Sequence, residues 1–549
     1  MSRAGRGIDR VRSDLGQLAQ LLSPRTGLTF LRAGVLDARE VAALGVALPW
    51  YVGRGPSLGL VSAVNAMAVG GKTAIHDRSG ALTWRELDAR ANRLANALAA
   101  RGLRGGDRLA LLLRNGREFA ESILAAQKIG VVACPLNTWA KPKELRHTLE
   151  SVEPKLLVHD AAHAEQVRGA GIDDLPVVVV GEDGAASYED VLAEAPDTPP
   201  PPFTPRRGSS GVVIHTSGTT GRPKGAARDA SRTGVRELIG LLRVVPFHRD
   251  DVILCPAPMF HSFGLLTFTV GCLLGATLVL PSRFDPEDTL DAIEEHRATA
   301  VSLVPVMIHR IASLPEEVTS RHDTSSLRIL LASGSAIPPD LRRGVADLFG
   351  PVLYDLYGST EAGWVAIATP QDMRERPETA GRPVPGVEVA VFSPQGIRLV
   401  AGQTGELYVK SRALFEGYTS GEEKERLGEF MSIGDLGHLD REGFLYVQGR
   451  ADDMVVVGGE NVYPREVEEV VAAVPGVREV AVFGAPDREY GEVLVAFVVG
   501  DVDAEEVVAA CRSQLASFKV PRKVEIVDEL PRNATGKVLK RELLPRIGA

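Results

Sequence analysis

Apolar and polar positions along the chain follow two different periods, and each period predicts one kind of element. After Thr83, apolar side chains recur at every third or fourth position, which is typical of an amphipathic helix. Thr83 and Glu86 have the spacing of a capping box, and Leu82 and Leu87 flank it as a hydrophobic staple. A helix that begins after Thr83 and ends before Gly102 is therefore predicted.

Short, continuous apolar runs alternate with helical segments over most of the chain. Runs of this length, bounded by turn residues, predict buried strands. The strands predicted in this way cover residues 109–113, 131–134, 156–158, 177–180, 299–304, 327–331 and 352–357. Strands that alternate with helices are typical of mostly parallel, helix-covered sheets, so the predicted fold class is α/β.

The pattern changes near Gly449 and Arg450. Beyond them a small α+β unit is predicted, with strands at 480–483, 493–499 and 524–527 and a helix at 504–515. The chain is therefore divided into an N-terminal extension (1–55), a large domain (56–449) and a smaller C-terminal domain (450–549). Within the large domain, the proline-rich segment 194–210 is predicted to be a linker.

Two apolar stretches raise the question of a membrane. Residues 264–280 form an uncharged run of 17 residues, at the short limit for a membrane span. Gly271, Gly275 and the β-branched end of this run favour a buried helix that leads into a strand. In the extension, Leu15, Leu18, Leu21 and Leu22 suit an amphipathic helix that packs on the core or contacts a membrane surface or an acyl partner.

Composition narrows the class of protein. Hydrophobic residues make up 44% and charged residues 24% of the 549, which is typical of a globular chain. A formal net charge of −9 argues against a nucleic-acid partner held by a broad basic face. The four cysteines lack the spacing of a zinc site or a disulfide framework, and the N-terminus lacks a secretory pattern. A cytoplasmic location is expected, with membrane association left open.

One segment is typical of phosphate handling. It combines hydroxyl residues, glycines and a lysine in the order Thr216, Ser217, Gly218, Thr219, Thr220, Gly221, Arg222, Pro223, Lys224 and Gly225. Glycines let backbone N–H groups turn toward an anion, and the lysine adds a mobile positive charge. The segment is not a Walker A loop, because no Ser or Thr follows Lys224. A surface loop rich in turn residues is the alternative.

Further segments match one family when they are taken together with this loop. They are 258–264 (PMFHSFG), 356–361 (LYGSTE), 434–440 (GDLGHLD), 449–453 (GRADD), 458–461 (GGEN) and 531–537 (PRNATGK). In this order and spacing they resemble the adenylate-forming superfamily, which comprises acyl-CoA synthetases, nonribosomal-peptide adenylation domains and luciferases. The extended N-terminus is most similar to bacterial fatty acid CoA ligases.

The resemblance implies an enzyme, an acid–thiol ligase of fatty acid metabolism that converts a fatty acid, ATP and CoA to acyl-CoA, AMP and pyrophosphate. The intermediate is an acyl-adenylate, and Mg²⁺ is the required metal. A medium to long acyl chain is expected, and a homodimer is left open. In this family the small C-terminal domain is mobile and changes its position between the two half-reactions.

The resemblance also assigns roles to individual residues. Lys537, Thr360, Glu361 and His261 are the expected catalytic residues, and Glu361 is the expected Mg²⁺ ligand. Asp452 is the expected hinge residue. The expected nucleotide- and CoA-binding residues are Thr216, Ser217, Gly218, Thr219, Thr220, Gly221, Lys224, Gly334, Ser335, Tyr357, Asp435, Arg450, Gly458 and Gly459.

Each of these assignments has a structural alternative. Lys537 has the alternative of a solvated surface charge, and Glu361 that of a helix-capping or surface carboxylate. Asp435 suits a loop that caps its own backbone, Gly458 and Gly459 suit a strand end, and His261 suits a satisfied core histidine. Two departures from the family pattern affect adenine affinity and pocket shape: His215 precedes the loop where an aromatic residue is usual, and 333–336 (SGSA) replaces a more glycine-rich turn.

Three other functions are open on the sequence. An acyl-AMP ligase would load an acyl carrier protein instead of CoA, and neither a fused carrier domain nor an obvious extra insertion is present. A luciferase-type oxygenase shares the first half-reaction. A non-catalytic nucleotide-binding relative would lack Glu361 or Lys537, and both are present.

Overall fold

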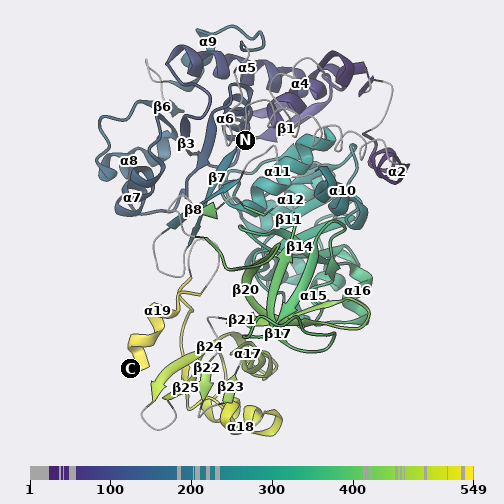
Figure 1. Ribbon diagram of the computed structural model, residues 1–549, viewed down its shortest axis with the longest axis vertical. Coiled ribbons are helices and arrows are strands. Elements are labelled where there is room, and N and C mark those ends of the chain that lie inside the picture. Colours follow the sequence, from purple (N-terminus) through teal and green to yellow (C-terminus); the bar gives the residue numbers. More distant parts are fainter. Residues whose placement is uncertain are drawn as a thin grey trace.

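A computed structural model gives the chain a large N-terminal part and a smaller C-terminal part (Figure 1). The residues it describes are 24–35, 39–40, 42–47, 57–181, 187–201, 203, 211–217, 223–228, 235–411, 414–415, 417–418, 423–451, 455–457, 460–462, 464–487, 491–515, 517–532 and 538–547. Among them are four β-sheets, three in the large part and one in the small part.

The first sheet has seven strands. In sheet order they are β18 (Gly417–Tyr418), β8 (Pro223–Arg228), β7 (Val212–Ser217), β4 (Val132–Pro135), β3 (Arg108–Leu112), β5 (Leu156–Asp160) and β6 (Val177–Val180). From β7 to β6 the strands are parallel, whereas β8 and β18 are added antiparallel at one edge. Four of the predicted strands are confirmed here as β3, β4, β5 and β6.

The second sheet has nine strands. In sheet order they are β15 (Arg382–Pro383), β14 (Gly363–Ala368), β13 (Leu353–Ser359), β12 (Ile329–Ser333), β11 (Ala300–Leu303), β9 (Val252–Leu254), β10 (Thr277–Val279), β1 (Thr73–Asp77) and β2 (Gly80–Thr83). The strands from β13 to β1 are parallel, and antiparallel strands close both edges. The remaining predicted strands of the large domain are β11, β12 and β13.

Helices accompany both sheets. Those of the large part are α2 (Pro24–Arg32), α4 (Leu58–Ala68), α5 (Trp84–Ala100), α6 (Arg117–Lys128), α7 (Pro142–Val152), α8 (Ala164–Ala170), α9 (Tyr188–Ala193), α10 (Val235–Val244), α11 (Ser262–Leu274), α12 (Pro286–Glu295), α13 (Pro305–Ala312), α14 (Glu316–Thr319), α15 (Pro339–Phe349) and α16 (Pro370–Glu375). The largest core cluster joins Leu87 of α5, Phe119 of α6 and Phe268 of α11 to strands of both sheets.

Two local predictions for these helices are confirmed. α5 begins with the capping box of Thr83 and Glu86, and Gly102 follows its end with a φ of +90°. The apolar run 264–280 forms α11, ends at Gly275 in the left-handed conformation and leads into β10. Within the described part of the chain, no helix is both long enough and apolar enough to cross a membrane.

The third sheet is antiparallel throughout and was not predicted. Its strands are β16 (Glu388–Phe392), β17 (Gly405–Lys410), β20 (Phe430–Leu439), β19 (Arg426–Leu427) and β21 (Leu445–Arg450). Polar residues and glycines interrupt the apolar positions of β17 and β20, whereas β16 contains a short buried apolar run at 389–392 that was not predicted as a strand. The prediction of mostly parallel sheets therefore holds for two of the three sheets in the large part.

Among the described residues of the C-terminal part are one sheet and three helices. The sheet consists of β23 (Glu460–Val462), β22 (Val455–Val457), β25 (Gly491–Gly500), β24 (Val477–Asp487) and β26 (Lys523–Ile526). The helices are α17 (Pro464–Ala472), α18 (Ala504–Gln514) and α19 (Lys540–Leu543), together with the short turns Ser517–Lys519 and Leu544–Ile547. The three predicted strands and the predicted helix are confirmed, although β24 is longer than predicted.

The limits of the predicted domains stay predictions. Leu15, Leu18, Leu21 and Leu22 lie outside the described residues, so the amphipathic helix expected there does as well. The change from the antiparallel sheet to the C-terminal sheet falls between β21 and β22, close to the predicted limit at residue 450. In Figure 1 the C-terminal part lies at the lower end of the molecule, next to β20 and β21.

Candidate active site

Several predicted site residues follow neighbouring strands of the nine-stranded sheet. His261 lies beyond β9, the turn of Gly334 and Ser335 comes directly after β12, and Thr360 and Glu361 come directly after β13. Because these strands are parallel, their carboxyl ends meet at one edge, where α/β folds bind ligands. Ser262 Oγ and Thr360 Oγ1 lie 3.4 Å apart, so the segments that follow β9 and β13 are in contact at this edge.

The turn after β12 has a conformation that favours glycine. Gly334 has a φ of +106°, which L residues with side chains rarely adopt. Just before it, the buried Ser333 hydroxyl donates to the carbonyl oxygen of Leu356 on β13 at 2.8 Å. The turn is therefore joined to the strand that carries Tyr357, as the predicted adenine-binding pair requires.

Glu361 is held by a segment far away in the sequence. The backbone N–H of Phe415 donates to the Glu361 carbonyl oxygen at 2.8 Å, and the Tyr418 hydroxyl donates to Glu361 Oε1 at 2.7 Å. Sequence reasoning did not select Tyr418. The available signal was its place in the pair Gly417–Tyr418, which follows β17 in the chain. The carboxylate at this edge thus has a defined orientation.

Tyr357, Asp435 and Arg450 form a second cluster. The Tyr357 hydroxyl donates to Asp435 Oδ2, and Arg450 Nη1 lies 3.3 Å from Asp435 Oδ1. Asp435 and Arg450 are paired across β20 and β21, so the sheet itself brings them together. Burial, and after it the Asp435 carboxylate, raises the pKa of Tyr357 well above its usual value. Tyr357 therefore stays a protonated donor at neutral pH.

His261 is a buried and neutral imidazole. Burial lowers its pKa to about 4, so it carries no charge at pH 7. Its Nε2 is buried, and the structure gives it no hydrogen-bond partner among the described residues. Two rings accompany it: the centroid of Phe260 lies 4.3 Å away, and that of the half-exposed Trp139 lies 6.3 Å away. Sequence reasoning missed Trp139, which comes from the loop after β4 in the other sheet.

Asn115 holds the loop that precedes His261. Its Nδ2 donates to the carbonyl oxygens of Cys255 and Ala257 at 3.1 and 3.0 Å, and its Oδ1 accepts from the N–H of Met259 at 2.8 Å. Asn115 follows β3 and is only 8% exposed, so one buried side chain joins the two sheets at the site. No signal in the sequence marked this residue.

Gly264 packs closely against the backbone of the loop that precedes α11. A Cβ at this position would lie 2.3 Å from the carbonyl oxygen of Pro258. The first turn of α11 therefore lies directly on the backbone of the loop held by Asn115. Phe263 is buried in the main core cluster, with 9% of its surface exposed.

The predicted phosphate loop lies at the end of a hairpin. β7 and β8 pair antiparallel, with Thr216 opposite Lys224 and Ser217 opposite Pro223. The tip of this hairpin contains Gly218, Thr219, Thr220 and Gly221, which lie outside the described residues. Asp452, Gly458, Gly459 and Lys537 lie outside them too.

The protein groups near Glu361 suit a metal ion for which water and phosphate oxygens supply most of the ligands. No group of three or more His, Cys, Asp or Glu side chains with metal-binding geometry occurs in the described ranges. Glu361 supplies a single carboxylate, and its Oε1 partner is a neutral phenol. Mg²⁺ commonly takes one or two carboxylates plus water and substrate phosphates, so this arrangement fits Mg²⁺ bound together with ATP.

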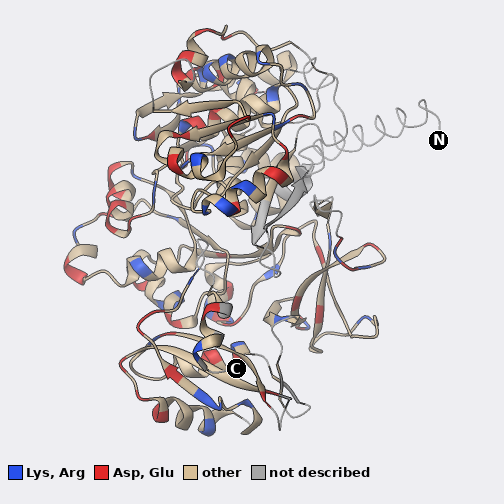
Figure 2. Cartoon of the chain, turned by 90° about the vertical axis from the view of Figure 1, so that its left-hand side faces the viewer, with Lys and Arg blue, Asp and Glu red and all other residues tan. Residues whose placement is uncertain are grey.

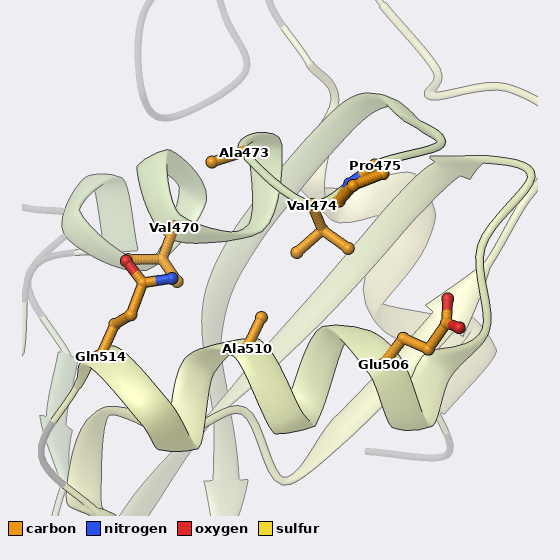
Figure 3. Close-up of a pocket in the computed structure, with 7 residues that line it drawn as sticks. All are labelled: Val470, Ala473, Val474, Pro475, Glu506, Ala510 and Gln514. Carbon is orange, nitrogen blue, oxygen red and sulfur yellow. The ribbon is translucent and has the colours of Figure 1, made fainter.

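A pocket of about 390 Å³ lies elsewhere, between α17 and α18 of the C-terminal part (Figure 3). It is lined by Val470, Ala473, Val474, Pro475, Glu506, Ala510 and Gln514. None of the predicted site residues lines it.

Basic and acidic residues are interspersed along the described ribbon in Figure 2. The candidate site therefore rests on the strand-edge geometry.

Comparison with known proteins agrees with this geometry. Residues 63–419 match the family model described as AMP-binding enzyme, and residues 466–537 match its C-terminal domain. The chain is 36% identical to a feruloyl-CoA synthase of Amycolatopsis sp over 486 residues, which cover 87% of this chain and 96% of that protein. It is 33% identical over 476 residues to the long-chain-fatty-acid–CoA ligase FadD13 of Mycobacterium tuberculosis, covering 85% and 93% of the two chains.

A solved structure extends the comparison. ATP-bound MatB from Rhodopseudomonas palustris superposes with a TM-score of 0.78 at 33% identity, covering 86% of this chain and 95% of that one. Both the large and the small part of the chain therefore have counterparts in proteins of known structure.

Proposed function

Because the chain belongs to the AMP-binding enzyme family, within the adenylate-forming superfamily of acyl- and aryl-CoA ligases, we propose that it is a fatty acid–CoA ligase. In this family the carboxylate of the acid attacks the α-phosphorus of ATP, pyrophosphate leaves and an acyl-adenylate forms. The sulfur of CoA then attacks the acyl carbon, and AMP leaves. The observation that carries the proposal is that the segments containing His261 and Thr360–Glu361 reach one strand edge and are in contact there through Ser262 and Thr360.

The nucleotide end of the proposed site has the required groups. Tyr357 supplies an aromatic face, and the Gly334–Ser335 turn supplies close backbone for a flat base on the other side. Asp435 and Arg450 supply an acceptor and a donor for the ribose hydroxyls. The hairpin tip between Ser217 and Pro223 is assigned to the β- and γ-phosphates, because its glycines and hydroxyls suit an anion.

Charge is the main obstacle to the first half-reaction, because a carboxylate has to approach a polyphosphate. Glu361 is proposed to hold Mg²⁺, which when bound neutralises phosphate charge. Thr360 is proposed to donate to the α-phosphate. Lys537 is proposed to contact the substrate carboxylate and the phosphate together while charge moves between them.

The acyl end of the proposed site is built around His261. A neutral imidazole holds a carboxylate by a hydrogen bond without adding a further charge. The apolar helix α11 begins directly after it, and apolar walls suit an alkyl chain. The relative named long-chain-fatty-acid–CoA ligase supports the same class of acid.

An aromatic acid is the second candidate substrate. The relative at 36% identity is named feruloyl-CoA synthase, after an aromatic acid. Trp139 and Phe260 meet edge to face beside His261, with ring centroids 5.1 Å apart. Aromatic side chains in this arrangement suit an aryl group as well as an alkyl chain.

Mass spectrometry of the products tests the proposal. The protein is incubated with ATP, Mg²⁺ and a graded panel of fatty and aromatic acids, with and without CoA. Fatty acyl-CoA and AMP are the expected products. Aryl-CoA formed in preference to fatty acyl-CoA would replace the first candidate by the second.

The same experiment separates the remaining functions. Acyl-adenylate that accumulates unchanged in the presence of CoA would indicate a carrier-protein loader, and oxygen-dependent light would indicate a luciferase-type enzyme. The absence of any adenylate with every acid would indicate a non-catalytic relative. The homodimer and the membrane contact stay predictions.

A further inference from the structure

The hydrogen bond from the Tyr418 hydroxyl to Glu361 Oε1 has no role in the proposed function as stated above. We propose that Tyr418 is a positioning residue that orients the Glu361 carboxylate and couples it to the phosphate hairpin. The inference rests on the proposed function, since it takes Glu361 as the carboxylate that holds Mg²⁺ with ATP. Two independent features of the fold carry it: the hold on Glu361 and the strand that contains Tyr418.

The hold on Glu361 comes from one short segment at both ends of the residue. Phe415 donates its backbone N–H to the Glu361 carbonyl oxygen at 2.8 Å, and Tyr418 donates its hydroxyl to Oε1 at 2.7 Å. The rings of Phe415 and Tyr418 pack edge to face, with centroids 4.9 Å apart at an interplanar angle of 69°. Phe415 is only 3% exposed, so the segment is anchored in the core of the antiparallel sheet.

The strand that contains Tyr418 joins Glu361 to the hairpin. β18 pairs antiparallel with β8, with Gly417 opposite Ala227 and Tyr418 opposite Ala226. Ala226 is two residues along β8 from Lys224, which lies opposite Thr216 on β7. A displacement of the hairpin by the polyphosphate would therefore move the residue that holds Glu361.

The chemistry of the donor matters as much as its place. A Lys or Arg partner would orient Glu361 but would also compensate its charge, whereas a phenol donates one hydrogen bond and stays neutral. Groups of this kind, which orient a metal ligand without binding the metal, change metal affinity by about 10- to 100-fold when they are removed. Tyr418→Phe keeps the ring and its packing on Phe415 and removes only the donor.

Calorimetric titration of the full-length protein tests the inference without relying on turnover. Binding of ATP is measured once with excess Mg²⁺ and once in EDTA, for the wild-type protein, Tyr418→Phe and Glu361→Gln. Tyr418→Phe should weaken binding of Mg-ATP by about tenfold and leave binding of metal-free ATP unchanged. Tyr446→Phe is the matched control, because its ring stacks on His438 away from Glu361, and it should match the wild type in both titrations.

The double variant Tyr418→Phe/Glu361→Gln gives a second measurement. Since Tyr418 acts through Glu361, the tyrosine substitution should cause no further loss once the carboxylate is gone. The inference is wrong if Tyr418→Phe binds Mg-ATP as the wild type does while Glu361→Gln does not. It is also wrong if the tyrosine substitution weakens metal-free ATP equally, which would indicate a general loss of structure.

The outcome distinguishes this inference from the proposed function. If Tyr418→Phe has no effect but the wild-type protein forms acyl-CoA, only the role of Tyr418 falls. If neither the wild type nor any variant binds ATP with or without Mg²⁺, the proposed function is wrong, and the role proposed for Tyr418 is wrong as well.

Discussion

At the scale of the residue, His261 makes stability depend on pH. Burial lowers its pKa from about 6.5 to about 4. Between pH 4 and pH 6.5, His261 is therefore mostly protonated in the unfolded chain and mostly neutral in the folded chain. The stabilisation is therefore complete above pH 6.5 and is lost as the pH falls toward 4. Between pH 7 and pH 5 we expect His261 to lower the free energy of unfolding by about 2 kcal/mol.

Urea denaturation at both pH values measures this contribution. His261→Gln has no imidazole to titrate, so its free energy of unfolding should fall less than that of the wild type between pH 7 and pH 5. His309→Gln, at an exposed position on α13, is the control and should follow the wild type. An identical fall in all three proteins would contradict the assignment of His261 as a buried neutral group.

Asn115 is the second residue whose contacts lead to a prediction. Asn115→Leu keeps a similar volume but removes three hydrogen bonds to the loop of residues 255–259. Unpaired buried backbone groups cost about 1–3 kcal/mol each, so the loss of three bonds should lower the stability of the variant by at least about 3 kcal/mol. Because this loop leads to His261, the KM for the acid should rise more than the KM for ATP.

Steady-state kinetics with each substrate varied in turn check this asymmetry, and thermal denaturation checks stability. Asn96→Leu is the matched control, since its amide also donates to two carbonyl oxygens, those of Pro196 and Thr198, far along the chain from this loop. Equal increases in both KM values for Asn115→Leu would reduce its role to general stability.

At the scale of the element, the limits of α5 follow from local chemistry. Thr83 accepts from the N–H of Glu86, and Glu86 accepts from the N–H of Thr83, so the cap satisfies two backbone donors at the helix start. Thr83→Ala should lower the free energy of unfolding by about 1 kcal/mol, as measured by urea denaturation. Thr83→Ser keeps the acceptor and should retain most of the stability. Equal losses for the two variants would mean that the cap is not the cause.

Elements with a local cause were predictable, and those without one were not. The cap of α5, the left-handed Gly275 after α11 and the continuous apolar runs of β3, β5 and β12 are all marked by residues within one segment. The antiparallel sheet from β16 to β21 is marked less clearly, because polar residues such as Glu406, Ser432 and Asp435 interrupt the apolar positions of β17 and β20. β24 exceeds its predicted length because its pairing with β25 continues beyond the apolar run 480–483 through polar residues such as Glu479 and Asp487.

The candidate site divides along the same line. Tyr357, Asp435, Thr360 and Glu361 were predicted as site residues from their motifs, and the fold brings Tyr357 to Asp435 and Thr360 to Ser262, the neighbour of His261. Asn115, Trp139 and Tyr418 were not. Each acts on a partner from another sheet or a distant segment, and such contacts depend on strand order, which the residue pattern of one segment does not contain.

At the scale of the whole molecule, the described contact between α17 of the C-terminal part and β21 of the large part includes polar groups. Arg465 on α17 donates to the carbonyl oxygen of Val447 on β21 at 3.0 Å and also pairs with Glu469 on its own helix. On the other side of the boundary, Arg342 and Asp355 form a buried ion pair whose charges lie near Arg465. A polar junction of this kind separates at lower cost than an apolar one, which suits a part that changes its position.

If the C-terminal part moves in this way, one substitution should separate the two half-reactions. Lys537 belongs to the C-terminal part, and the site that it is proposed to serve lies in the large part. If it acts only while the carboxylate attacks ATP, Lys537→Ala should lower the rate of acyl-adenylate formation by at least about 100-fold, the scale of a lost electrostatic contact in a transition state. The rate of thioester formation from supplied acyl-adenylate and CoA should change by less than about threefold, because that step uses a different arrangement of the two parts.

Rapid-quench measurement of each half-reaction with purified acyl-adenylate tests both expectations, with Lys540→Ala on α19 as the control for loss of a nearby charge. Equal losses in both half-reactions would refute the view that the molecule uses Lys537 in only one of two geometries.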